Sequence, residues 1–330
     1  MRRGYAFCFY GLLKLLRISL STRNFPPQAG VANADGELEL TWAELVWAAV
    51  SVGRGTLSHL HQHGIFSMFE IVYRIAMIYA NLLESASGRV VRSSAYEGLD
   101  PSEKSAISYF LGLALTKAFV AKRLDVPWLM HVDVYRQQFG LQMIPYGGRP
   151  DLFGRSVSGD WIVAESKGRT NWHDSGALER AKTQAQQVTS IAGVAPALRM
   201  GLVTSFTNGW LSLFVDDPPT SRTRKPLNYK ISDVELKAAY YAPFRALLEA
   251  NSRRREDIRG RRIDIVRLDS SDLEVGIVEE LGADKNPELP LVGSPQFAGD
   301  SEFLGIDGIF VRLGSSWGED RMILEPQTRK

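Results

Sequence analysis

The stretch PDLFGRSVSGDWIVAESKG, residues 150–168, decides the fold. Residues 151–155 and 161–167 carry apolar and aromatic side chains, and a Ser/Gly/Asp turn separates them. Two such runs joined by a short turn are typical of a β-hairpin. Since alternate side chains of a strand share one face, Glu165 and Lys167 project to the same side of the second strand. The stretch therefore predicts a hairpin whose second strand ends in a charged pair.

Charged side chains at the end of an apolar strand are costly to bury unless they have a purpose. Asp151, on the first strand, is expected to lie against Glu165 across the hairpin. Two carboxylates and one ammonium group that converge in this way suit Mg²⁺ or Mn²⁺. Such a metal lowers the pKa of a bound water and neutralises charge during in-line displacement at phosphorus. Lys167 would orient or deprotonate that water, and the backbone carbonyl of Ser166 is a candidate further metal ligand.

The segments around the hairpin predict a mixed sheet flanked by helices. An apolar periodicity that follows an Asp-Pro-Ser-Glu start predicts the first helix, and apolar runs predict the strands. The expected elements outside the hairpin are a helix over 99–124, a strand over 128–135, a helix over 177–191 and strands over 198–206 and 210–215. The order is helix, strand, strand, strand, helix, strand, so we expect an α/β fold.

This arrangement resembles the PD-(D/E)XK nuclease superfamily, which has the restriction-endonuclease-like fold. The resemblance rests on Pro150-Asp151, on Glu165-Ser166-Lys167 and on the element order, and covers roughly residues 100–215. It implies an αβββαβ core that hydrolyses phosphodiester bonds with Mg²⁺ or Mn²⁺. Asp151 and Glu165 would be metal ligands and catalytic residues, together with Lys167. Families of this type often act on DNA, in bacterial defence against foreign DNA, in repair or in mobile-element biology.

The resemblance also implies supporting residues. Family members often supply a glutamine from the helix after the lysine strand, and Gln184 or Gln187 stands at that place. The resemblance implies that Gln184 assists catalysis, and an ordinary exposed helical glutamine is the alternative interpretation. Many have an acid on the first core helix, where Glu103 is a candidate metal ligand; a helix N-terminus also favours an acid as a cap. Phosphate contacts are expected from nearby basic side chains, for which solvated helix faces are the alternative interpretation. These side chains are Arg149, Arg180, Lys182, Lys117 and Lys122.

Three regions are expected along the chain. Residues 1–98 are predicted to be mostly helical, residues 99–216 to form the nuclease core, and residues 217–330 to form an α+β accessory region. The sequence Asp217-Pro218-Pro219 marks the second boundary. The elements expected in the flanking regions are helices within 40–87 and over 233–254 and strands over 263–268, 273–278 and 308–313.

Composition indicates a cytoplasmic protein outside the membrane. The lone cysteine, Cys8, allows no disulfide within the chain, and no uncharged apolar run is long enough for a membrane span. Residues 4–13 are apolar, but Lys14 and Arg17 follow them, so a buried strand or helix is preferred to a signal peptide. The net charge of +2 is nearly balanced, so any basic surface must be local. The candidates are Arg253, Arg254, Arg255, Arg259, Arg261 and Arg262, and Arg222, Arg224 and Lys225, with a solvated helix end and a loop as alternatives.

A competing motif lies upstream. His59, His61 and His63 alternate as metal ligands do on a strand of amidohydrolases. That zinc site would need further His and Asp ligands, and only His131 and His173 remain. A loop that leads into the next helix is the preferred interpretation.

A further alternative function and several properties of the proposed nuclease stay open. The chain could be a nuclease-fold nucleic-acid-binding protein that is catalytically silent or requires a partner. The sequence also leaves open DNA against RNA, endonuclease against exonuclease, and a homodimer against a larger complex.

Overall fold

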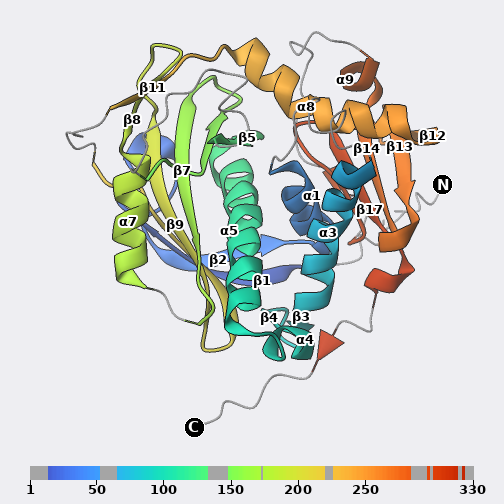
Figure 1. Ribbon diagram of the computed structural model, residues 1–330, viewed down its shortest axis with the longest axis horizontal. Coiled ribbons are helices and arrows are strands. Elements are labelled where there is room, and N and C mark those ends of the chain that lie inside the picture. Colours follow the sequence, from blue (N-terminus) through green and yellow to red (C-terminus); the bar gives the residue numbers. More distant parts are fainter. Residues whose placement is uncertain are drawn as a thin grey trace, which may run out of the picture.

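The computed structural model describes residues 14–52, 65–132, 148–171, 174–219, 226–283, 296–297, 300–318 and 322–323. Two large β-sheets lie side by side, with helices on their faces and between them (Figure 1). Buried apolar side chains of both sheets and of the helices form one connected core. The fold is therefore α/β with a mixed sheet, as the sequence predicted.

The first sheet has ten strands of mixed direction. Its strands are β1 (Leu16–Arg23), β2 (Asp35–Leu40), β3 (Leu82–Ser85), β4 (Val90–Arg92), β5 (Trp128–His131), β6 (Leu152–Arg155), β7 (Trp161–Gly168), β9 (Leu198–Thr207), β10 (Trp210–Asp216) and β18 (Met322–Ile323). The central strands follow the spatial order β10-β9-β7-β6-β5. Strand β7 is parallel to β9 and antiparallel to β6, so it lies inside the sheet.

The second sheet is antiparallel and comes from the C-terminal part of the chain. Its strands are β12 (Arg253–Ile258), β13 (Arg261–Leu268), β14 (Leu273–Val278), β15 (Gln296–Phe297), β16 (Glu302–Leu304) and β17 (Ile309–Leu313). Strands β8 (Val188–Ile191) and β11 (Leu227–Tyr229) form a separate parallel pair. The helices are α1 (Trp42–Ser51), α3 (Ile65–Asn81), α4 (Ser94–Glu97), α5 (Pro101–Leu124), α7 (Ser175–Ala185), α8 (Asp233–Ala250) and α9 (Glu279–Ala283), with short 3-10 turns η1 (Pro27–Ala29), η2 (Asp269–Ser271) and η3 (Ser315–Trp317).

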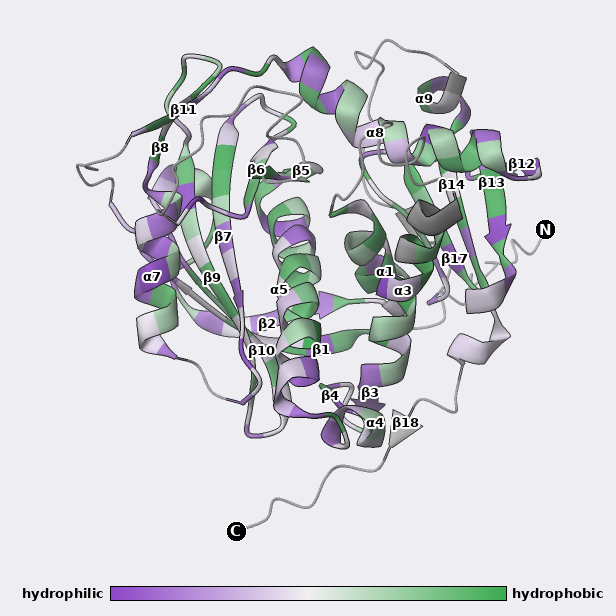
Figure 2. Ribbon diagram, in the orientation of Figure 1, coloured by the Kyte–Doolittle hydropathy of each residue, from purple (hydrophilic) through white to green (hydrophobic). Residues whose placement is uncertain are grey.

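Helices α5 and α7 cover opposite faces of the first sheet. Ser166 of β7 lies against Gly112 of α5, where an added Cβ would approach its hydroxyl to 2.8 Å. Glu165 is paired with Gly201 of β9, which lies against the backbone of Lys182 in α7. Since successive strand residues face opposite sides, α5 and α7 enclose β7 between them. Figure 2 shows α7 as largely hydrophilic, which fits a helix with one buried face.

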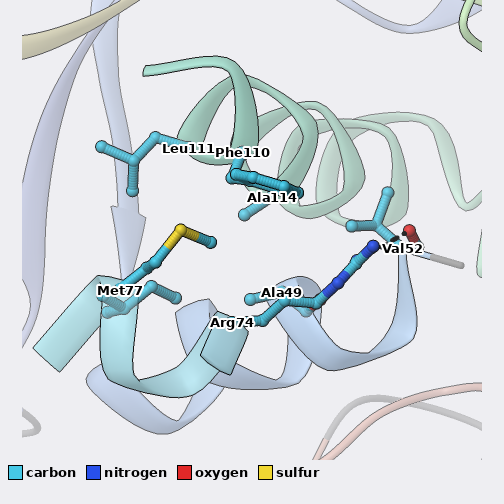
Figure 3. Close-up of a pocket in the computed structure, with 8 residues that line it drawn as sticks. Ala49, Val52, Arg74, Met77, Phe110, Leu111 and Ala114 are labelled. Atoms are coloured by element: carbon cyan, nitrogen blue, oxygen red, sulfur yellow. Dashed lines mark hydrogen bonds between the residues drawn. The ribbon is translucent and has the colours of Figure 1, made fainter. Parts of the chain in front are cut away.

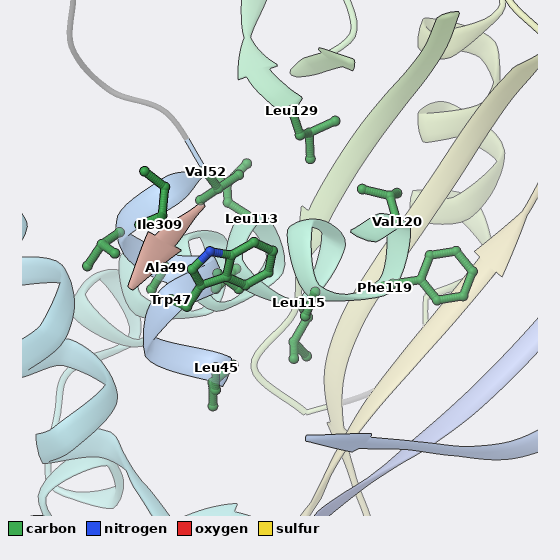
Figure 4. Packing of buried hydrophobic residues seen from close by; sticks show 14 of the residues in the cluster. Leu45, Trp47, Ala49, Val52, Leu113, Leu115, Phe119, Val120, Leu129 and Ile309 are labelled. Atoms are coloured by element: carbon green, nitrogen blue, oxygen red, sulfur yellow. The ribbon is translucent and has the colours of Figure 1, made fainter. Parts of the chain in front are cut away.

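Helix α5 begins where its sequence predicted. The Asp100 carboxylate accepts hydrogen bonds from the backbone N–H groups of Ser102 and Glu103 at 2.6 and 3.2 Å. The Glu103 carboxylate in turn accepts one from the Asp100 N–H, which completes a capping box. Figure 4 shows the apolar side chains of α5 beside those of α1 and beside Leu129 of β5. The cap and this buried side together define the helix.

A cavity of about 10 Å³, room for at most one water molecule, lies among α1, α3 and α5. Arg74, which lies beside this cavity, is 6% exposed, and its guanidinium caps the end of α1. It donates hydrogen bonds to the carbonyls of Ala49 and Val52 at 3.3 and 3.4 Å (Figure 3). Because the last carbonyls of a helix have no partner within it, Arg74 serves as a cap for α1.

The region predicted to be mostly helical contributes strands as well as helices. Residues 1–98 do form α1 and α3, but they also supply β1 to β4 of the first sheet. Strands β1 and β4 both pair with β10, and β18 returns from the C-terminal region to pair with β3. The first region is therefore part of the central sheet and no separate helical unit. Strands β3 and β4 are too short to show a periodicity, whereas the alternation of β1 (Leu16, Ile18 and Leu20 buried) was a signal that the prediction missed.

Two predicted helices are shorter than expected. The helix expected over residues 177–191 ends at Ala185, and β8 follows it. The helix expected to reach residue 254 ends at Ala250, so the arginine run lies on β12. There Arg254 is 2.7 Å from Glu274, and the exposed run lies on a strand and not at a helix end. Within the described parts of the chain, no helix is long and apolar enough to cross a membrane.

Candidate active site

The predicted hairpin forms, and β7 extends beyond β6 at the end that carries the charged residues. Strand β6 pairs with β7 from Arg155 back to Leu152, which lies opposite Ala164. Strand β7 continues beyond this last pair through Glu165 while it stays paired with β9. Asp151 directly precedes β6. Among the described residues, β6 pairs with this edge of β7 no further than Ala164, so the edge is open there toward Asp151, one residue past the last pair.

The hairpin brings Asp151, Glu165 and Lys167 together. The backbone N–H of Asp151 donates a hydrogen bond to Glu165 Oε2 at 2.6 Å. The backbone N–H of Ser166 donates one to Asp151 Oδ2 at 3.1 Å. The Lys167 ammonium group forms an ion pair with Glu165 Oε1. Asp151 thus contacts Glu165 through its backbone N–H, and Glu165 contacts Lys167, so the three residues lie together as the spacing predicted.

Glu165 is the buried member of this group. It is 1% exposed, whereas the Lys167 side chain is 24% exposed. Burial, and after it the Asp151 carboxylate, raises the pKa of Glu165 to about 8, against the opposing effect of Lys167. Ionising Glu165 beside the Asp151 carboxylate is therefore unfavourable without a further cation. A cation that contacts both carboxylates would relieve this repulsion.

Close packing positions the end of β7 from both sides. A Cβ on Gly168 would overlap the carbonyl of Ser108 in α5. A Cβ on Gly201 would lie 2.8 Å from the backbone nitrogen of Lys182 in α7. Only glycine allows the two helices to approach the sheet this closely. The backbone that carries the charged residues is therefore held between two helices.

The donor set suits a hard cation. A strand residue directs its N–H and C=O toward the same neighbouring strand, so the Ser166 carbonyl points to the open edge beside Asp151. Two carboxylates and a carbonyl are ligands that Mg²⁺ accepts together with water. Among the described residues, no three His, Cys, Asp or Glu side chains lie close enough to hold a metal ion. Asp151, Glu165 and the Ser166 carbonyl would therefore need water molecules to complete the coordination of Mg²⁺ or Mn²⁺.

Gln184 supports the chain that leads into the site. Its side-chain amide donates a hydrogen bond to the carbonyl of Arg149 at 3.2 Å, and a Cβ on Gly148 would overlap it. Gln187 lies past the end of α7, where its carbonyl accepts a hydrogen bond from the Leu227 N–H at 2.7 Å. Of the two predicted glutamines, Gln184 is the one that contacts the segment before Asp151. Glu103 closes the capping box of α5, which is the alternative role predicted for it.

The burial of Lys117 contradicts its prediction as a phosphate contact. Its side chain is 0% exposed and donates a hydrogen bond to the Tyr240 hydroxyl at 2.8 Å. Its ammonium lies 3.9 Å from Asp307, which is also 0% exposed. Lys122 instead pairs with Glu44 at 3.1 Å. Lys117 faces α8 and the second sheet, which no local pattern in α5 could indicate.

The basic side chains of α7 have acidic partners. Lys182 lies 3.1 Å from Asp216, and Arg180 lies 3.1 Å from Asp174. Sequence reasoning missed Arg169, which lies 3.5 Å from the same Asp174 carboxylate. The signal was present, because residues 165, 167 and 169 continue one alternation.

The histidine motif at His59, His61 and His63 lies outside the described residues, as does His173. His131 of β5 is described, and its Nε2 is 2.9 Å from the Tyr109 hydroxyl of α5. It therefore contacts the helix on the face of the sheet opposite Glu165.

No known protein family, curated protein or solved structure matches this chain. Any functional assignment therefore depends on the geometry of the site and on the motif.

Proposed function

We propose that this protein is a metal-dependent nuclease with a restriction-endonuclease-like core. The observation that carries the proposal is the contact among Asp151, Glu165 and Lys167 at the open edge of β7. The order α5, β5, β6, β7, α7, β9 supports it, with β8 as an addition before β9. DNA is the proposed substrate, and defence against foreign DNA inside a bacterial cytoplasm is the proposed setting. Both rest on the family resemblance.

The burial of each residue suggests its role in the proposed reaction. Asp151, Glu165 and the Ser166 carbonyl would hold the metal. Bound Mg²⁺ would supply an acidified water and neutralise charge on the phosphate. Lys167 is partly exposed and stays near the carboxylates through its ion pair with Glu165, so it can orient the attacking water and contact a phosphoryl oxygen. Gln184 would keep the segment before Asp151 in place.

A cleavage assay tests the proposal. Supercoiled plasmid and labelled DNA and RNA oligonucleotides are incubated with Mg²⁺, Mn²⁺ or EDTA. We expect metal-dependent cutting that falls by about 100-fold or more in Asp151→Asn and Lys167→Met. Glu39→Gln is a control, because this side chain is exposed on β2. Undiminished cutting by the two site variants would refute the assignment. Tight binding without cutting under any metal would instead favour a silent nuclease-fold binding protein.

A further inference from the structure

Arg169 extends the charged row of β7 by one step. Its backbone N–H donates a hydrogen bond to the Thr204 carbonyl of β9 at 2.8 Å, so the parallel pairing continues past the end of β7. Alternate strand residues share a face at intervals of about 6.5 Å. Arg169 therefore follows Glu165 and Lys167 on the face that α7 covers. Its Nε lies 3.5 Å from Asp174, the residue that precedes α7.

Arg180 reaches the same carboxylate from α7. Its guanidinium lies 3.1 Å from Asp174 Oδ2, the oxygen that Arg169 also approaches. Two guanidinium groups thus share one carboxylate, which leaves a formal charge of +1 (two positive, one negative). The exposed fractions are 33% for Arg169, 60% for Arg180 and 44% for Asp174. The cluster is therefore cationic and open to solvent.

The chemistry of this cluster favours an oxyanion. Guanidinium groups bind carboxylate and phosphate oxygens with the same geometry, so a phosphate can replace a carboxylate between two arginines. An exposed ion pair contributes little to stability, so replacing the Asp174 carboxylate with a phosphate costs little free energy. Arg169 and Lys167 are two residues apart on the strand, which is about 6.5 Å. The phosphate that Arg169 contacts would therefore be a different one from the phosphate at Lys167.

We propose that Arg169 and Arg180 bind the phosphate that neighbours the scissile one, and that Asp174 occupies this place until nucleic acid binds. The inference rests on the proposed nuclease function and specifies its substrate class. The substrate is a polynucleotide that binds with two consecutive phosphates: the scissile phosphate lies at the metal site, and its neighbour lies between Arg169 and Arg180. A phosphodiester without that neighbouring phosphate would bind poorly.

Binding of a fluorescent DNA oligonucleotide tests this with Ca²⁺ in place of Mg²⁺, at several salt concentrations. We expect Arg169→Gln and Arg180→Gln each to weaken binding about tenfold and to reduce the salt slope of log K by about one. Arg169→Lys should retain the slope, because it keeps the charge. Asp174→Asn should tighten binding, since it removes the competing carboxylate. Arg267→Gln is the matched control, with a side chain 51% exposed and paired with Asp269 on the second sheet.

The outcomes separate this inference from the proposed function. Wild-type slopes in both glutamine variants would overturn it, and so would weaker binding by Asp174→Asn, which would mean that the carboxylate only supports the fold. Thermal unfolding of each variant checks that the fold is intact. A wild type that neither binds nor cuts DNA or RNA would refute both proposals. A wild type that cuts DNA, with both glutamine variants equal to it in binding, would refute this inference alone.

Discussion

Replacing Glu165 with glutamine should stabilise the metal-free protein while it removes metal-dependent activity. The reason is the raised pKa of Glu165, about 8 in the fold against 4.5 for an ordinary glutamate, caused first by burial and then by Asp151. Between these two pH values the native state retains a proton that the unfolded chain has released. Stability contributed by this group is therefore present at low pH and is lost as the pH rises from about 4.5 to about 8.

The size of the effect follows from the two pKa values. Each pH unit in that window lowers the free energy of unfolding by about 1.4 kcal/mol, or on the order of 3 kcal/mol at pH 7. Glutamine is neutral, and its carbonyl can still accept the hydrogen bond from the Asp151 N–H. It weakens the contact between this side chain and the partly exposed Lys167, which costs about 1 kcal/mol or less. Glu165→Gln should therefore be about 2 kcal/mol more stable at pH 7 and about equal at pH 5.

Urea unfolding in EDTA, followed by tryptophan fluorescence at pH 5, 6, 7 and 8, measures this difference. The exposed Glu39→Gln variant should follow the wild type at every pH. Added Mg²⁺ should stabilise the wild type and not Glu165→Gln, because ligands stabilise only the state that binds them. Parallel pH profiles of wild type and Glu165→Gln, or a less stable Glu165→Gln at pH 7, would refute the reasoning.

Two further predictions concern the packing around the site. Lys117→Met should lower the free energy of unfolding by about 3–5 kcal/mol, because it leaves a buried carboxylate without its cation; Lys104→Met on the same helix should cost under about 1 kcal/mol, and equal losses in urea unfolding would contradict the assignment. Gly168→Ala should cost about 1–3 kcal/mol and reduce cleavage, since its Cβ overlaps the Ser108 carbonyl, whereas Gly36→Ala, with open space around it, should match the wild type in both assays.

Local signals in the sequence predicted the core elements. The apolar runs on both sides of a Ser/Gly/Asp turn predicted the hairpin of β6 and β7, and the cap at Asp100 predicted the start of α5. The hairpin and the helix cap both depend on contacts between residues that are close together in the chain. The contact between Asp151 and Glu165 follows from the same hairpin pairing.

Long-range pairing escaped prediction. Strand β1 pairs with β10, so Ser19 lies opposite Ser212, and β18 reaches back to β3. Lys117 looked like a solvated residue of α5, yet Tyr240 and Asp307 from distant parts of the chain enclose it. Nothing in the helix itself encodes these partners.

The sequence by itself determined which charged groups stand at the end of β7 and which of them share a face, because strand alternation is a local property. Only the tertiary structure decided how those groups behave. Burial between α5 and α7 raises the pKa of Glu165, and the start of α7 brings Asp174 to both Arg169 and Arg180. The pKa of Glu165 depends on the solvent that the whole fold excludes, and the pairing at Asp174 depends on where α7 begins, so no short stretch of sequence contains that information.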